Sequence, residues 1–126
     1  ALAVMHEIEH ENLLPAVNQR GEALRAALNQ RFGKHPHVGD IRGRGLFIGL
    51  ELVQDRDTKT PFSPTQRVHA RLKAAAMKAG LMCYPMGGTI DGQTGDHILL
   101  APPFIIDDSH IAEITDKLAI ALEETI

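Results

Sequence analysis

Cysteine is almost absent from this sequence, because Cys83 is the only one. An internal disulfide and a cysteine-based zinc site are therefore excluded, and the scarcity is typical of the reducing cytoplasm, where we expect the protein to be located. Long apolar runs are missing as well. The longest ones, residues 46–50 and 98–106, fall far short of the roughly 20 residues that cross a bilayer, so no membrane-spanning segment is expected.

The sequence also lacks a large excess of charge of either sign. Thirteen Lys and Arg residues against sixteen Asp and Glu residues give a net charge of -3. The chain therefore lacks the basic surface that nucleic acids and anionic membranes require, and neither is expected as a partner. With 126 residues, 44% of them hydrophobic, it suffices for one domain over residues 1–126. Such a domain buries roughly two-thirds of the surface of its unfolded chain.

The first residues have helical periodicity but no residue that would cap a helix. Native helices usually start at Ser, Thr, Asp or Asn, so we expect residues 1–11 to be the tail of a helix cut from a longer chain. Asn12 predicts the start of a second helix, which ends at Gly33 and makes a close contact at Gly21. Its expected buried line consists of Leu14, Val17, Leu24, Leu28 and Phe32.

The middle of the chain predicts a strand followed by a helix. Alternate positions between residues 46 and 53 are apolar, which places Leu46, Ile48, Leu50 and Leu52 on one face of a strand. The run from Ser63 to Gln66 has the cap residue, proline and glutamine of a capping box, so a helix is expected to begin there and close at Gly80. Its expected buried line consists of Val68, Leu72, Ala75 and Ala79.

The last third of the chain predicts two short strands and a helix. The strands are expected at residues 81–84 and 97–101, on either side of a glycine-rich connection at 86–95. Asp107 or Asp108 should cap the final helix. The order of elements predicts an α/β fold of the α+β two-layer type, with a small mixed or antiparallel sheet packed against helices. The expected buried line of the last helix consists of Ile111, Ile114, Leu118, Ala121 and Leu122.

Three patterns suggest chemistry but have simpler interpretations. The glycines of residues 43–49 lead into a strand rather than from a strand into a helix, so they indicate a tight turn and not a dinucleotide-binding loop. His6 and His10 lie one helical turn apart but lack a third ligand, so no metal is expected. Cys83 with His97 as its base would make a nucleophile, yet a cysteine among apolar residues is more commonly packed.

Arg42 and Arg44 are candidate binding residues. The planar fork of a guanidinium suits a carboxylate or a phosphate. Either arginine could equally pair with Glu51 or with a neighbouring chain. Physical chemistry alone does not choose between these two interpretations.

Four segments carry a family resemblance: VGDIRGRGLFIGLEL at residues 38–52, KAGL at 78–81, YPMGGT at 84–89 and ILLAPPFII at 98–106. Together they resemble the class III pyridoxal-phosphate aminotransferases, and the first resembles the segment that begins the C-terminal small domain. The similarity covers nearly the whole chain. It implies the small domain of fold type I, with residues 1–11 as the tail of the interdomain helix.

The resemblance implies a homodimeric enzyme that uses pyridoxal phosphate to move an amino group between an amine or amino acid and a 2-oxo acid. In the family, the Schiff-base lysine, the acidic partner of the pyridinium nitrogen and the phosphate-binding groups lie upstream, in an N-terminal cofactor domain. That domain is the implied partner of this chain. We therefore expect no catalytic or cofactor-binding residue here, no bound cofactor and no activity from this chain alone. Its lysines fall in loops or on polar helix faces: Lys34, Lys59, Lys73, Lys78 and Lys117.

The resemblance also gives four candidate substrate-binding residues: Arg42, Arg44, Tyr84 and Leu99. Leu99 stands where relatives that act on α-amino acids carry a carboxylate-binding arginine, and Tyr84 stands near the mobile arginine of amine-preferring relatives. Since neither is arginine, Arg42, Arg44 or the absent domain is left to hold the carboxylate. Without that domain, an apolar face should be exposed and the chain should self-associate. The alternative is a stand-alone, non-catalytic binding or regulatory module with the same fold.

Overall fold

One antiparallel sheet of four strands organises the chain in the computed structural model, which describes residues 1–126. The strands are β1 (Val38–Arg44), β2 (Phe47–Leu52), β3 (Tyr84–Gly87) and β4 (Asp96–Leu100). They lie in the order β1-β2-β4-β3, so β2 and β4 are central and the other two form the edges. Of the two predicted sheet types, the antiparallel one is confirmed.

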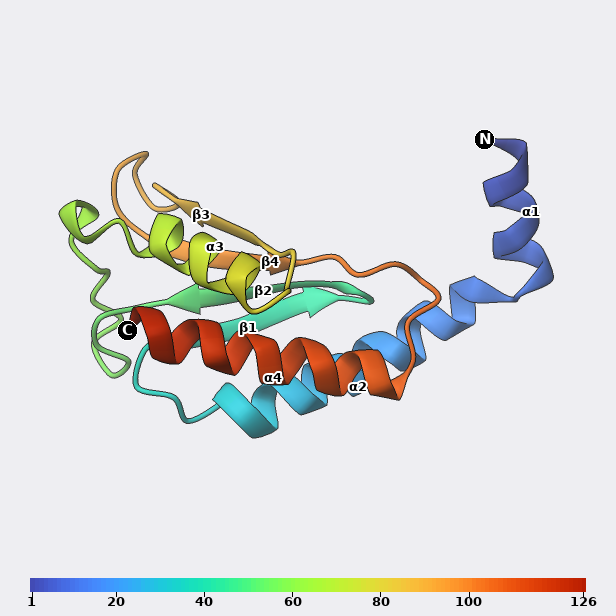
Figure 1. Cartoon of the computed structure of the whole chain (residues 1–126), viewed down its shortest axis with the longest axis horizontal. Helices are drawn as coiled ribbons and strands as arrows, with labels where there is room; N and C mark the ends of the chain where they lie inside the picture. Colours follow the sequence, from blue (N-terminus) through green and yellow to red (C-terminus); the bar gives the residue numbers. More distant parts are fainter.

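Three helices cover one face of this sheet, as Figure 1 shows. They are α2 (Leu13–Phe32), α3 (Val68–Lys78) and α4 (Asp108–Thr125), and α4 contacts both of the others. The remaining helix, α1 (Leu2–His10), stands away from the sheet and buries none of its residues (Figure 1). The predicted two-layer architecture is therefore confirmed. None of the helices combines the length and the apolar character that crossing a bilayer requires.

The core lies between the sheet and the three helices. Alternate residues of the two central strands face it, and Ile48, Leu50 and Ile98 are completely buried. The alternation predicted for β2 is thus confirmed, because every second side chain of a strand points to the same face. The side chains at the intervening positions, which are polar or exposed, point to the other face of the sheet.

The helix α2 follows its predicted buried line except at its start. Leu14, expected to be buried, is 64% exposed, and Leu13 is buried in its place. Asn12 adopts a left-handed conformation and its side chain makes no capping hydrogen bond, so the chain enters α2 with the first residue facing the body. The other members of the predicted line are buried or half-buried: Val17, Leu24, Leu28 and Phe32.

The start of α3 differs from the prediction. Pro64–Gln66 forms a short 3-10 helix, and Arg67 with a φ of 48° separates it from α3, so Ser63 does not cap this helix. The buried Asp96 of β4 takes that role: its Oδ1 accepts hydrogen bonds from the backbone N–H of His69 at 3.1 Å and from Nδ1 of His69 at 2.7 Å. A carboxylate at a helix N-terminus satisfies a free N–H group and interacts favourably with the helix dipole.

The end of α3 confirms the predicted glycine cap. Gly80 has a φ of 80°, its N–H donates to the Met77 carbonyl at 3.1 Å, and the N–H of Leu81 donates to the Ala76 carbonyl at 2.8 Å. This is the hydrogen-bond pattern of a Schellman motif. Ala76 is buried, whereas Ala79, the predicted core residue, is only half-buried.

Two later predictions have different outcomes. The strand expected at residues 81–84 is wrong in position, because β3 pairs with β4 only from Tyr84 to Gly87. The residues before Tyr84 complete the cap of α3 and carry the chain back to the sheet. At α4, Asp107 is the cap: its Oδ1 accepts from the backbone N–H groups of Ser109 at 3.0 Å and His110 at 3.1 Å.

Helix and sheet approach each other closely where α2 crosses the turn between β1 and β2. Arg44 pairs with Phe47, which leaves a two-residue turn whose first residue, Gly45, has a φ of 55°. A Cβ atom at Gly21 would overlap the carbonyl oxygen of Gly45. The tight turn and the close contact at Gly21, both predicted, are confirmed. Backbone meets backbone here, with no room for a side chain.

Replacing Gly21 with alanine is expected to lower the free energy of unfolding by about 2 kcal/mol or more, because the new methyl group forces α2 away from the turn. In an open helix the same change would stabilise the protein by about 1 kcal/mol. Urea denaturation measures the difference. Gly49→Ala is the matched control, since its Cβ would find its nearest atom 3.6 Å away. Equal stability of the two variants would contradict the close contact.

A row of aromatic rings ties the end of α2 to the far end of the sheet. Ring centroids lie 6.5 Å apart for Phe32 and His35, and 5.9 Å apart for His35 and His37. The backbone N–H of His37 donates to Nδ1 of His35 at 3.1 Å. That nitrogen must therefore carry a lone pair, which a protonated imidazole lacks. Burial, helped by the charge of His37 and opposed by Glu123, holds the pKa of His35 below its ordinary value.

Acid should therefore weaken the fold at His35. As the pH falls below the ordinary histidine pKa of 6.5, the unfolded chain takes up this proton before the folded chain does, and the free energy of unfolding decreases. His35→Asn keeps an acceptor atom near the position of Nδ1 but cannot titrate. We expect a shallower loss of stability between pH 7 and about 5 for this variant, measured by urea denaturation. An unchanged slope, matching that of the exposed control His6→Asn, would refute the assignment.

Candidate functional site

The face of the sheet opposite the helices is covered by no helix, and we call it the open face. Its side chains come from alternate positions of all four strands, and none of them is buried. Charged, aromatic and aliphatic groups are mixed on it. The open face consists of Asp40, Arg42, Arg44, Phe47, Gly49, Glu51, Tyr84, Met86, His97 and Leu99.

Strand register brings three of the four candidate residues into one row across the open face. Arg42 pairs with Gly49, Gly49 pairs with Leu99, and Leu99 pairs with Tyr84. Leu99 and Tyr84 are therefore direct neighbours on adjacent strands, although they are far apart in sequence. Gly49 has no side chain, which leaves a low point in the row between Arg42 and Leu99. The fourth candidate, Arg44, lies two residues further along β1 on the same face.

Arg42 is held by carboxylates of its own sheet. Its Nη1 donates to Oδ2 of Asp40 at 2.7 Å and lies 3.7 Å from Oε2 of Glu51. The hydrogen bond from Arg42 is the main cause that lowers the pKa of Asp40, and the same bond raises the pKa of Arg42. Two acidic side chains already surround this guanidinium, so a further anion would have to displace one of them. The pairing with Glu51 was one of the two interpretations left open by the sequence.

Arg44 is the unpaired cation of the open face. Its side chain is exposed and makes no hydrogen bond or ion pair within the chain. It lies at the last pair of the β1–β2 hairpin, opposite Phe47, which is 59% exposed. A free guanidinium beside an exposed aromatic ring can bind a carboxylate without first breaking an internal ion pair. Sequence analysis did not distinguish Arg42 from Arg44, but in the structure only Arg44 is free to bind an anion.

A hollow of about 410 Å³ lies on the open face at this row and is lined by Arg42, Gly49 and Leu99, but not by Arg44. His97 forms part of its wall, together with Thr89 and Ile90 from the connection between β3 and β4. Burial, and secondarily the charge of Arg42, hold the pKa of His97 below its ordinary value, so the imidazole is neutral at neutral pH. Sequence analysis missed this position on the face. The alternation of β4 was the available signal, because His97 and Leu99 are two residues apart and share a face.

An apolar depression of about 480 Å³ lies at the end of the sheet where β4 leaves it. Met82 and Ile105 line it and are 85% and 69% exposed. Pro102 and Pro103 end β4 here, as predicted, because proline cannot donate to the strand ladder. Large apolar side chains are thus uncovered at the same end of the domain as Arg44 and Phe47.

The residues of this chain do not fit a pyridoxal-phosphate site. A Schiff-base lysine needs an enclosed environment, but none of the five lysines is buried. Only Lys117 lines one of the two hollows, the apolar depression, and its Nζ is paired with Oε1 of Glu113 at 2.5 Å. A helix N-terminus is a common binding site for a phosphate group, because its backbone N–H groups are free to donate. The N-termini of α3 and α4 are instead filled by the carboxylates of Asp96 and Asp107. We therefore derive no step of cofactor chemistry from this chain.

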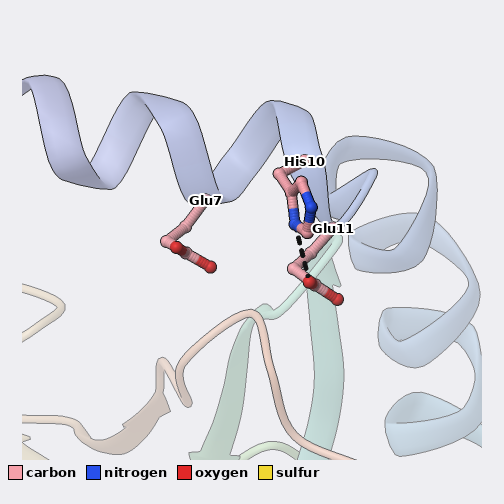
Figure 2. A group of neighbouring side chains, drawn as sticks. All are labelled: Glu7, His10 and Glu11. Atoms are coloured by element: carbon pink, nitrogen blue, oxygen red, sulfur yellow. Dashed lines mark hydrogen bonds and ion pairs between the residues drawn. The ribbon is translucent and has the colours of Figure 1, made fainter.

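The last turn of α1 and the residue after it carry a group of potential metal ligands, drawn in Figure 2. One ligand atom from each of Glu7, His10 and Glu11 lies within 4.8 Å of the others, and Nδ1 of His10 is 2.9 Å from Oε1 of Glu11. All three side chains are exposed. His6 is not in this group, and its ring stacks on that of His10 with centroids 5.6 Å apart. We assign this solvated turn no metal role.

Comparison with known proteins gives a consistent result. The family described as aminotransferase class-III matches residues 1–122. An uncharacterised aminotransferase of Schizosaccharomyces pombe is 41% identical over 126 residues, which cover 100% of this chain and 28% of the relative. A taurine–pyruvate aminotransferase of Bilophila wadsworthia is 35% identical over 98% of this chain and 27% of its own length. The chain thus spans about a quarter of the length of the curated relatives it matches.

Solved structures agree with the sequence comparison. A Bacillus anthracis aminotransferase superimposes with a TM-score of 0.85 and 38% identity, over 97% of this chain and 26% of that one. An (S)-enantioselective omega-transaminase of Thermomicrobium roseum gives a TM-score of 0.87 at 26% identity, over 99% of this chain and 26% of that one. The two-layer fold is therefore one that occurs as a quarter of larger proteins.

Cys83 and His97 do not form a nucleophile and base. Cys83 packs against the core on the helical side of the sheet, whereas His97 lies on the open face, opposite Met86. Burial raises the pKa of the Cys83 thiol to about 11. At neutral pH the thiol is therefore protonated and a poor nucleophile.

We expect Cys83 to react with iodoacetamide on the order of 100-fold more slowly in the folded chain than in the urea-unfolded chain, because fewer thiolates are present. The rate of alkylation, followed by mass spectrometry at pH 7.5, measures this difference. His97→Ala serves as a control and should leave the rate unchanged. A folded rate equal to the unfolded one, or a rate that falls in the His97 variant, would show an activated cysteine instead.

Proposed function

The chain belongs to the class III aminotransferases, and we propose that residues 1–126 are the C-terminal small domain of a longer, pyridoxal-phosphate-dependent enzyme. In this proposal residues 1–11 are the tail of a helix that connects the two domains. The observation that carries the proposal is that the whole chain matches only 26% to 28% of each larger relative. The reaction proposed is transfer of an amino group between an amine or amino acid and a 2-oxo acid.

The proposed role of this domain is recognition rather than chemistry. The family is pyridoxal-phosphate-dependent, yet no lysine of this chain is buried, and carboxylates occupy the N-termini of α3 and α4. The cofactor and its Schiff-base lysine are therefore assigned to an N-terminal domain of the same polypeptide. The open face would close over the substrate and exclude water from it.

We assign the carboxylate of the 2-oxo acid to Arg44. Arg42 is occupied by Asp40 and Glu51, whereas Arg44 has no partner in the chain. Tyr84 and Leu99, direct neighbours across β3 and β4, would form an apolar wall beside the transferred group. A relative described as a taurine–pyruvate aminotransferase makes pyruvate the natural first acceptor to test.

Exposed apolar groups support a partner for this domain. The side chains of Leu2, Val4 and Met5 on α1 are 88%, 62% and 55% exposed, and Phe47 and Ile105 are exposed on the body. Covering such groups stabilises an assembly by about 25 cal/mol per Å² of apolar surface. We propose that the cofactor domain covers them in a cytoplasmic homodimer, and that the isolated chain self-associates for the same reason.

Absorbance with added pyridoxal phosphate tests the proposal. We expect no Schiff-base band from the 126-residue chain, and a band plus amino transfer to pyruvate from the longer polypeptide that contains it, because the reactive lysine lies outside this chain. Variants of the 126-residue chain in which one lysine at a time is replaced identify the source of any unexpected Schiff-base band. A band that one such replacement abolishes would contradict the proposal. A coding sequence that starts just before Ala1 would instead favour a stand-alone binding or regulatory module.

A further inference from the structure

We propose that Arg25, on α2, is a positioning residue that fixes the direction in which Arg44 points from the β1–β2 hairpin. The inference rests on the proposed function, in which Arg44 holds the carboxylate of the acceptor. Arg25 itself lies on the helical side of the sheet and does not reach the open face. Its effect on the substrate would therefore pass through the backbone of β1.

Three residues of α2 follow the hairpin along one stripe of the helix. Val17, Gly21 and Arg25 are spaced four residues apart, so they lie one above the other on the same side. The first two contact Gly45. A Cβ atom added at Gly21 would overlap the Gly45 carbonyl, and a Cβ atom added at Gly45 would lie 2.8 Å from Val17. The third reaches further back along β1. The helix therefore contacts the hairpin on both sides of Arg44.

Arg25 makes a direct hydrogen bond to that hairpin. Its Nη2 donates to the carbonyl oxygen of Gly43 at 2.6 Å. Gly43 immediately precedes Arg44, and its side-chain position is blocked because a Cβ would overlap the carbonyl of Phe47. A charged donor on a backbone carbonyl makes a stronger hydrogen bond than a neutral one. The peptide unit between Gly43 and Arg44 is thus held in one orientation.

The same guanidinium has a feature that stability alone does not explain. Nε of Arg25 is buried and has no hydrogen-bond partner. Burying an unpaired donor is unfavourable, so most buried donors in native proteins are paired. A shorter apolar side chain would avoid this penalty at the same position. This penalty is explained if the role of Arg25 is to donate the hydrogen bond from Nη2 to the Gly43 carbonyl.

Arg44 needs such a constraint because glycine stands on both sides of it. Gly43 and Gly45 have φ values of 157° and 55°, and glycine samples these and other conformations freely. A long side chain at the end of a strand, between two residues that can rotate freely, needs further contacts to be oriented for a two-point hydrogen bond to a carboxylate. Arg25 and Gly21 remove this freedom by fixing the residues before and after Arg44. Recognition would then depend on α2 although α2 contacts no substrate.

Kinetics of the full-length enzyme with two acceptors test this inference. Pyruvate carries the carboxylate, and acetaldehyde is the same acceptor without it. We expect Arg44→Gln to raise the KM for pyruvate about tenfold or more, because the charge-assisted two-point contact with the carboxylate is lost. Arg25→Gln should raise it several-fold with kcat nearly unchanged, and Arg25→Lys should restore part of the loss. Neither Arg25→Gln nor Arg44→Gln should change the KM for acetaldehyde.

A matched control and a double variant complete the design. Arg20 lies on the same helix and also donates to a backbone carbonyl, that of Phe104, so Arg20→Gln reports on general loosening of α2. It should leave the ratio of the two KM values unchanged. The double variant Arg25→Gln with Arg44→Gln should be no worse for pyruvate than Arg44→Gln alone, because Arg25 acts only through Arg44. Melting temperatures confirm that each variant is folded.

The outcomes separate the two proposals. If Arg44→Gln raises the pyruvate KM and Arg25→Gln does not, the positioning role is wrong and the carboxylate assignment stands. The positioning role is also wrong if the two effects add in the double variant, or if Arg25→Gln raises both KM values together. If Arg44→Gln leaves the pyruvate KM unchanged, the carboxylate assignment and the inference that rests on it are both overturned.

Discussion

Direct backbone contact between α2 and the β1–β2 turn is the constraint on which the arrangement of this domain depends. At Gly21 and Gly45 no side chain separates the two elements, so the helix lies as close to the sheet as main chains allow. That distance places α2 against β1, and Leu24 and Leu28 are completely buried in the core. It also fixes the hairpin end, which carries the free arginine of the open face.

Elements specified by neighbouring residues were predictable from the sequence. The alternation in β2 and the glycine cap of α3 each depend on residues a few positions apart, and both are confirmed. The start of α3 was not predictable, because its capping carboxylate comes from Asp96, which is 27 positions away from His69 in sequence. Ser63 had the right local pattern, but the 3-10 helix that follows it ends before α3 begins. The start of α3 therefore depends on a contact between residues that are distant in sequence.

The candidate site also combines features that the sequence predicts with features that depend on how the strands pair. Family resemblance selected four residues, and strand alternation was enough to place Arg42 and Arg44 on one face. The difference between these two arginines depends on what stands beside Arg42. Asp40 is on its own strand, but Glu51 reaches it only through the pairing of β1 with β2. The adjacency of Tyr84 and Leu99 depends likewise on register, which becomes fixed only when the strands pair.

The location of all three packed helices on one side of the sheet has a consequence for how such a domain can change over time. Side chains on the helical side are interlocked, so a substitution there disturbs several neighbours. Side chains on the other side have few neighbours within the domain, and replacing them costs little thermodynamic stability. If the open face meets the substrate, as proposed, substrate preference can diversify by successive substitutions on one surface while the scaffold beneath it stays the same.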